Sequence, residues 1–118
     1  MLAKLTTHVL DTAHGCPARG LRLELWSLAG PAPKLLKTAL TNDDGRVESP
    51  LLAGPELAVG EYEVVFLVGD YFAQKEPSNR APRFLDRVPV RFHITDATVS
   101  YHVPLLCSPY GYTTYRGS

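Results

Sequence analysis

The chain has little cysteine and no excess of charge of either sign. Its 118 residues include two cysteines, Cys16 and Cys107, which lie far apart and lack Cys-x-x-Cys spacing. A disulfide framework or a zinc ribbon is therefore disfavoured, and we expect two free thiols that act as small apolar fillers. The 12 basic and 12 acidic side chains cancel, so neither nucleic acids nor membranes are expected as partners.

Long hydrophobic runs and several common catalytic motifs are also missing. Because no run is long enough for a signal peptide or a transmembrane helix, the expected compartment is the cytoplasm. The sequence has no Gly-x-Ser-x-Gly elbow, no His-Glu-x-x-His pair and no glycine-rich phosphate loop. Serine hydrolases, zinc proteases and nucleotide enzymes find no support, and we expect neither a metal nor a cofactor. The length favours a single domain over residues 1–118.

Short segments bounded by glycine and proline predict a β-rich fold. Apolar and polar side chains alternate in residues 6–10 and 21–26, as they do in half-buried strands. Further strands are expected at residues 37–41, 60–69, 88–95 and 99–106. Seven or eight strands separated by regular turns favour a β-sandwich.

One short helix and two strands with restricted pairing are also expected. Residues 70–75 predict the helix, with Asp70 as its N-cap and Pro77 at its end. Pro89 and Pro104 cannot donate a ladder hydrogen bond. Their strands should therefore lie at sheet edges or be paired on the other side only.

A tight turn is expected at residues 42–46 (NDDGR), where Gly45 can adopt a positive φ. Arg46 follows that glycine, so we expect it to lead into a new strand. Taken alone, an arginine after a turn is usually a solvated charge.

Two histidines are expected on the outside of the sandwich. Period-two geometry places His8 on the outer side of its strand with Thr6 and Leu10, while Leu5, Thr7 and Val9 face the core. His102 is outward as well, on a face that it shares with Pro104 and Leu106. An apolar outer face that carries an imidazole is typical of a subunit interface enclosing a pocket, so we expect a homo-oligomer.

Polar and aromatic side chains continue to the last residue of the sequence. The last eighteen residues, from Tyr101 to Ser118, hold a strand histidine, several tyrosines, an arginine and an ionised terminal carboxylate. Most chain ends fray into small polar residues. This segment is therefore a candidate part of a site.

Residues 5–18 (LTTHVLDTAHGCPA), residues 42–46 and the segment from His102 to Ser118 resemble the 5-hydroxyisourate hydrolases, the transthyretin-related proteins. The resemblance covers essentially the whole chain, and the terminal YRGS distinguishes these hydrolases from transthyretin, a hormone carrier. It implies a transthyretin-like β-sandwich of two four-stranded sheets with one short helix. It also implies a homotetramer, a dimer of dimers with active sites in the channel between dimers, that hydrolyses 5-hydroxyisourate to 2-oxo-4-hydroxy-4-carboxy-5-ureidoimidazoline.

The resemblance also assigns roles to individual residues. His8, Arg46, His102 and Ser118 match the positions of the family's catalytic group. His8 and Arg46 are implied to bind the substrate too, together with Tyr115, which matches a substrate-contacting tyrosine. All of these residue types are present.

The chain departs from the family at two positions outside that group. Ser100 stands where the family often has a histidine, so any role of that histidine in tuning its neighbour or in binding a metal is absent. Cys16 stands where many members carry threonine or another small residue.

The residue types suit the opening of a cyclic amide. An imidazole that titrates near neutral pH can activate a water molecule or supply a proton to the departing nitrogen. Arg46 can hold a carbonyl oxygen or an anionic substrate, and its charge disfavours protonation of a nearby imidazole. The Ser118 carboxylate can orient an imidazole, as the acid does in a catalytic triad. These arguments leave open whether His8 or His102 is the base.

Two other functions stay open. A carrier of transthyretin type would use the same channel for an aromatic ligand, and an interaction module would use the exposed sheet edges to bind another protein. A carrier should tolerate residues appended after Ser118, whereas the hydrolase should not. A strand histidine taken alone is more often structural, and the motifs around His8 and His102 are what favour a catalytic role.

Overall fold

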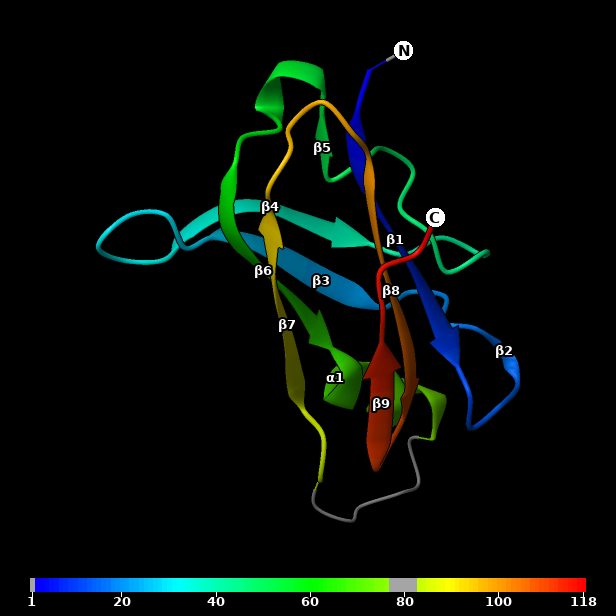
Figure 1. The fold of residues 1–118 in the computed structure, drawn as a ribbon. Helices are drawn as coiled ribbons and strands as arrows, with labels where there is room; N and C mark the ends of the chain where they lie inside the picture. Colours follow the sequence, from blue (N-terminus) through cyan, green and yellow to red (C-terminus); the bar gives the residue numbers. More distant parts are fainter. Residues whose placement is uncertain (1, 77–82) are drawn as a thin grey trace.

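The computed structural model describes residues 2–76 and 83–118 and shows two β-sheets packed as a sandwich (Figure 1). In the first sheet the strand order is β2-β1-β8-β9, and β5 also pairs with β1. Its strands are β1 Lys4–Asp11, β2 Cys16–Pro17, β5 Leu52–Ala53, β8 Tyr101–Ser108 and β9 Gly111–Thr114. The second sheet has the order β4-β3-β6-β7, with β3 Arg22–Ser27, β4 Lys34–Leu40, β6 Gly60–Leu67 and β7 Arg87–Ile94. The all-β sandwich is therefore confirmed, with β5 as an extra short strand in the first sheet.

The core lies between the two sheets and follows the alternation seen in the sequence. In β1, Leu5, Thr7 and Val9 are buried, while the residues between them are only partly covered. The fully buried side chains of the other strands include Leu23, Leu25, Val64, Phe66, Val88, Ile94 and Leu105. Each fully buried leucine or valine contributes roughly 1.5–3 kcal/mol through the removal of apolar surface from water. This burial holds the two sheets face to face.

Strands β1 and β8 lie side by side and run parallel, from Leu5 opposite Tyr101 to Asp11 opposite Cys107. The other strand pairs of the described residues are antiparallel. A parallel pair needs a long crossover, and here nearly the whole chain forms it. Segments close to opposite ends of the sequence consequently become neighbours in the middle of the first sheet.

Helix α1, Val68–Lys75, begins two residues earlier than expected. The prediction of Asp70 as N-cap is wrong, because Val68 and Gly69 are buried against the sandwich and already belong to the helix. Asp70 lies in the first turn, where a negative charge is favourable, and its carboxylate accepts a hydrogen bond from Arg83 at 2.6 Å. The expected end at Pro77 lies outside the described residues. A single 3₁₀ turn, Gly54–Glu56, follows β5.

The pairing of the proline-containing strands was predicted in part. β7 lies at the edge of its sheet, as Pro89 required. β8 is internal, so the edge alternative is wrong for Pro104. Pro104 is paired with His8 of β1 on one side, whereas the pairing of β8 with β9 on the other side begins only at Leu105. The second alternative, in which the proline residue is paired on one side only, is therefore confirmed for Pro104.

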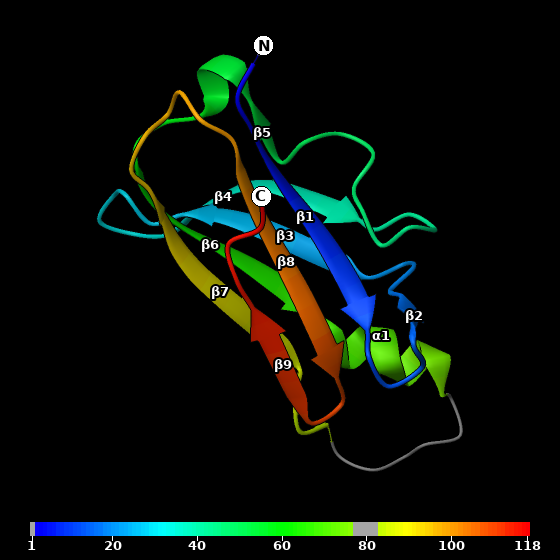
Figure 2. The ribbon, with the colours of Figure 1, turned by 45° about the vertical axis from the view of Figure 1, so that its right-hand side comes forward.

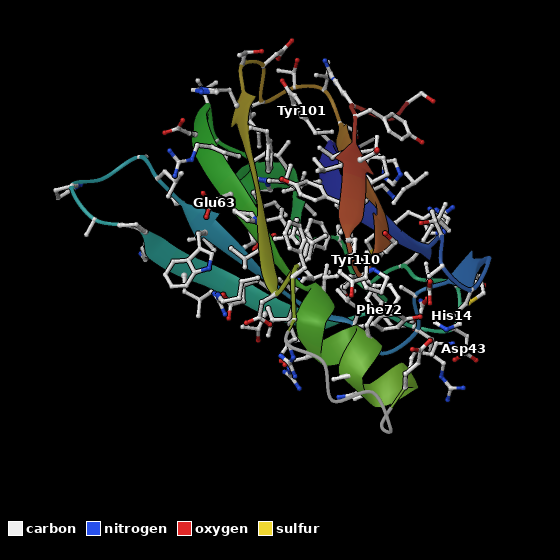
Figure 3. The ribbon with its side chains drawn as sticks, turned by 90° about the horizontal axis from the view of Figure 1, so that it is seen from below. His14, Asp43, Glu63, Phe72, Tyr101 and Tyr110 are labelled. Carbon is white, nitrogen blue, oxygen red and sulfur yellow. The ribbon has the colours of Figure 1, made fainter. Side chains whose placement is uncertain are left out.

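A buried carboxylate connects the end of β1 to α1. Asp11 accepts hydrogen bonds from the Tyr71 hydroxyl at 2.8 Å and from the His14 backbone N–H at 2.9 Å. The His14 imidazole lies 2.7 Å from the same carboxylate and stacks beside Phe72 of α1 (Figure 3). Burial alone would raise the pKa of Asp11, but the hydrogen bonds from Tyr71 and His14 outweigh it and lower that pKa.

Both cysteines are free thiols, as expected. Cys107 is buried, and burial raises the pKa of its thiol to about 12. Cys16 is only partly buried. Within residues 2–76 and 83–118, none of the helices has both the length and the apolar character needed to cross a membrane.

Candidate active site

The parallel pair of β1 and β8 brings both outward histidines to one face of the first sheet. Thr6 lies opposite His102, and His8 lies opposite Pro104 in the next pair but one. Thr6, His8 and His102 are half-buried, in contrast to the buried residues on the core side of the same strands. The outward placement of both histidines is confirmed. Paired strands are about 4.8 Å apart, so the two imidazoles come from adjacent strands.

Arg46 reaches this face through the turn that precedes it. The Asn42 side-chain oxygen accepts hydrogen bonds from the backbone N–H groups of Asp44 and Arg46, at 2.9 and 3.1 Å. Gly45 has φ +76° and its carbonyl accepts a hydrogen bond from Val9 at 2.8 Å. The turn is thereby attached to β1, and Arg46 forms an isolated antiparallel bridge with His8.

The expectation that Arg46 leads into a new strand is wrong. Within the described residues the bridge to His8 is its only ladder contact, and the chain stays irregular until β5 begins at Leu52. The arginine therefore sits on a loop beside β1. Its side chain is exposed rather than packed into a sheet.

The hydrogen bond of His8 defines which of its nitrogens carries a proton. His8 Nε2 lies 2.8 Å from the backbone carbonyl oxygen of Asp44. A carbonyl oxygen only accepts hydrogen bonds, so Nε2 is the donor. In the neutral imidazole the lone pair is then on Nδ1.

The C-terminal segment returns along β8 after β9, as the red end of the ribbon shows (Figure 2). The Thr114 hydroxyl donates to the Pro104 carbonyl at 2.8 Å, and the Arg116 guanidinium lies 4.4 Å from the centre of the Tyr101 ring. Gly117 N–H donates to the His102 carbonyl at 2.9 Å and forms an isolated bridge with it. The terminal residues are thus fixed beside His102.

Four backbone segments accordingly lie side by side across the sheet, carrying Arg46, His8, His102 and Gly117 in that order. Three strand spacings of about 4.8 Å give this row a width of roughly 14 Å. We call it the histidine row. It brings together three of the four residues expected to be catalytic, and Ser118 follows at its end.

The surroundings of His102 favour a neutral imidazole. Burial has the largest effect, followed by charge repulsion from Arg46 and from the protonated form of His8, and all three lower the pKa of His102 below its ordinary value of 6.5. A contact with the Thr6 backbone opposes them only in part. The expected influence of Arg46 on a neighbouring imidazole is therefore present.

Two hollows adjoin the histidine row. One, of about 250 Å³, is lined by His102, Tyr115 and Arg116 together with residues of β7. A smaller one, of about 130 Å³, is lined by Thr6 and Arg46 among others. A larger hollow of about 490 Å³ lies around Trp26 on the second sheet, away from the row. The described residues contain no group of three or more histidine, cysteine, aspartate or glutamate side chains arranged to hold a metal ion.

Three contributors to the row were not predicted as site residues. The Thr6 hydroxyl lies 2.8 Å from His102 Nδ1, Asp44 supplies the carbonyl that binds His8, and the Gly117 backbone packs against the His102 ring. Thr6 shares the outer face with His8, so alternation alone could have drawn attention to it. Its contact with His102 depends on the strand register, which the sequence does not show.

The arrangement of two imidazoles and a guanidinium on one sheet face defines a candidate acid–base site on a transthyretin-like sandwich. The HIUase/Transthyretin family matches residues 5–117. This chain belongs to that family.

Known members of the family cover the chain almost completely. The 5-hydroxyisourate hydrolase 2 of Rhizobium meliloti (strain 1021) is 56% identical over 115 residues, which are 98% of this chain and 96% of the relative. The crystal structure of (S)-allantoin synthase has a TM-score of 0.92 and 48% identity, and it covers 99% of this chain but 44% of its own. The chain thus spans less than half of that protein. Sea bream transthyretin in complex with thyroxine has a TM-score of 0.86 at 23% identity, covers 98% of this chain and 95% of its own, and shows the common fold.

Proposed function

We propose that this protein hydrolyses 5-hydroxyisourate to 2-oxo-4-hydroxy-4-carboxy-5-ureidoimidazoline. The observation that carries the proposal is the histidine row, in which His8, Arg46 and His102 occupy neighbouring backbone segments on one sheet face. The 56% identity to a 5-hydroxyisourate hydrolase over 98% of the chain supports the same activity. The reaction opens a cyclic amide by adding water.

The geometry of the row favours His8 as the base. Its Nε2–H is bonded to the Asp44 carbonyl, so its lone pair on Nδ1 takes the proton as the water oxygen bonds to the amide carbon. Arg46 stabilises the oxyanion that forms on the carbonyl oxygen. When the carbon–nitrogen bond breaks, the proton that His8 has taken from water passes to the departing nitrogen, while neutral His102 donates a hydrogen bond to that nitrogen, so both imidazoles return to their neutral forms.

The C-terminal residues have supporting roles in this proposal. Tyr115 lines the same hollow as His102, where it would contact the substrate. Ser118 follows Gly117 at the end of the row and would orient an imidazole or the substrate. Residues appended after Ser118 would crowd this end of the row, so the hydrolase should lose activity on extension.

We further propose that the active form is a cytoplasmic homotetramer, a dimer of dimers with the sites in the channel between dimers. Near the row, Leu106 is half-buried on the outer face of β8 and Tyr115 is 58% exposed, so apolar and aromatic surface is available to a second copy. The edge strands β7 and β9 offer unpaired backbone groups for a second copy. Sedimentation at assay concentrations tests this assembly, and a fully active monomer would refute it.

The test of the activity is the decay of 5-hydroxyisourate, generated in the cuvette from urate and urate oxidase. The wild type should accelerate the decay. His8→Ala and His102→Ala should lower turnover by about 10²–10⁴-fold, the usual contribution of a general acid or base. His14→Ala, which removes a histidine outside the row, is the matched control and should retain turnover.

A second pair of variants tests the guanidinium. Arg46→Lys keeps the charge but loses the two parallel donors, and we expect turnover to fall by about 10²–10³-fold. Arg19→Lys is its control, because Arg19 forms an exposed ion pair with Asp43 at 2.9 Å. The hydrolase function would be refuted if all variants of the histidine row retained turnover, or if the folded wild type did not accelerate the decay of 5-hydroxyisourate. The carrier alternative would then be tested with aromatic ligands.

A further inference from the structure

Thr6 is the side chain that binds the ring of His102. Its Oγ1 lies 2.8 Å from His102 Nδ1, and the two residues are directly paired across β1 and β8 although they are 96 positions apart. Thr6 lies on the outer face, in the smaller hollow that Arg46 also lines. The contact is therefore part of the histidine row rather than of the core.

The other edge of the His102 ring is held by the backbone of Gly117. A Cβ atom at residue 117 would overlap His102 Cδ2, so glycine is the residue that allows this close approach. Cδ2 lies on the ring edge away from Nδ1. With Thr6 at Nδ1 and Gly117 against Cδ2, the imidazole cannot rotate freely, and Nε2 is the nitrogen left for a substrate.

The Thr6 hydroxyl also influences which ring nitrogen of His102 carries the proton. A threonine hydroxyl has one proton to donate, and His102 Nδ1 is the hydrogen-bond partner of Thr6 Oγ1 in the described part of the chain. When Thr6 donates to Nδ1, the proton of the neutral imidazole resides on Nε2. His102 then presents an N–H group.

We propose that Thr6 is a positioning residue that holds His102 with its proton on Nε2, so that this N–H donates a hydrogen bond to the departing nitrogen. This role rests on the proposed hydrolase function. The two histidines of the row are thereby held in complementary forms, since Asp44 takes the Nε2–H of His8 and leaves a lone pair, whereas Thr6 occupies the lone pair of His102 and leaves an N–H. In this proposal the Asp44 carbonyl, which only accepts, and the Thr6 hydroxyl, acting as donor, decide which histidine is the base.

Kinetics of threonine variants test the proposal. Thr6→Val keeps the shape and removes the hydroxyl, and kcat should fall by about 10²-fold with little change in KM, because the ring is no longer held in reactive geometry. Thr6→Ser restores the hydroxyl and should recover most of the loss. The matched control is Thr7→Val, which removes the hydrogen bond from Thr7 to the Val103 carbonyl at 2.7 Å, on the core side of the same strand pair. It should be less stable but keep kcat.

A measurement without substrate separates this proposal from the proposed function. Nitrogen-15 NMR of the imidazoles identifies the protonated nitrogen of neutral His102, which should be Nε2 in the wild type and a mixture in Thr6→Val. Gly117→Ala should disturb the same signal, and its effect on kcat should not add to that of Thr6→Val, because both act through one ring. If the wild type fails to hydrolyse 5-hydroxyisourate, the function is refuted while the NMR result still decides whether Thr6 positions the proton. A wild-type proton on Nδ1, or unchanged kcat in folded Thr6→Val, would overturn the proposal.

Discussion

Replacement of Gly45 by alanine tests how the turn places Arg46. Gly45 has φ +76°, a conformation in which a side chain costs about 1–2 kcal/mol. A Cβ there would also overlap the Val9 carbonyl oxygen and lie 3.3 Å from the Ala18 nitrogen. Because these are backbone atoms of β1 and of the segment that follows β2, the turn itself has to move.

The size of the effect follows from the bonds that hold the turn. Moving it breaks the hydrogen bond from Val9 N–H to the Gly45 carbonyl, and an unpaired buried N–H costs about 1–3 kcal/mol. Together with the φ strain, the free energy of unfolding should fall by about 2–5 kcal/mol. Arg46 is the next residue, so its bridge with His8 should loosen and kcat should fall by about 10²-fold.

Gly20 supplies a matched control, because its φ is +77° and no atom lies within 4 Å of its Cβ position. Gly20→Ala should show only the cost of a side chain at positive φ. The free energy of unfolding of Gly45→Ala should therefore be lower than that of Gly20→Ala by about 1–3 kcal/mol, the cost of the lost hydrogen bond. Urea unfolding followed by Trp26 fluorescence, at one protein concentration, gives both values, and 5-hydroxyisourate decay gives kcat. Equal destabilisation of the two variants, or normal kcat in Gly45→Ala, would refute the reasoning.

Three further outcomes follow from the hydrogen bonds of Asp11 and from the buried thiol of Cys107. Tyr71→Phe removes the hydroxyl that donates to Asp11, so the free energy of unfolding should fall by about 1–3 kcal/mol; an unchanged urea midpoint would contradict this. Hydrogen bonds to Asp11 and then Glu76 raise the pKa of His14 from 6.5. The stability advantage of wild type over His14→Ala should be full below pH 6.5 and decline as the pH rises through the higher folded pKa, and a difference independent of pH would exclude this linkage. Since burial raises the pKa of the Cys107 thiol to about 12, iodoacetamide at pH 8 should alkylate Cys16 alone, as mass spectrometry of the folded protein can show; equal labelling of Cys107 would count against its burial.

Alternation along the sequence was sufficient to orient β1, because one side of that strand faces the core and the other does not. Thr7 and Val9 are buried and His8 is not, as expected. The turn at residues 42–46 was also predictable, since Gly45 has the required positive φ. Local chemistry and burial determine both features, and both can be seen in a short window of sequence.

The features that were missed depend on contacts between distant segments. β9 was not predicted because Gly111–Thr114 lies at a sheet edge, is largely exposed and lacks an apolar alternation. The start of α1 depends on the burial of Val68 and Gly69 rather than on a capping residue. The contact of Thr6 with His102 requires the register of β1 against β8, and no local pattern encodes that register.

The parallel pairing of β1 with β8 makes the histidine row a late product of folding. Thr6 and His102 meet only when a loop of 96 residues has closed, and such distant pairings form slowly because the entropy of closure is lost before the contacts are gained. A fragment that lacks either strand has half of the acid–base pair. Recovery of turnover during refolding would therefore report the joining of the two chain ends, and a proteolytic cut between them would leave activity only while both pieces remain associated.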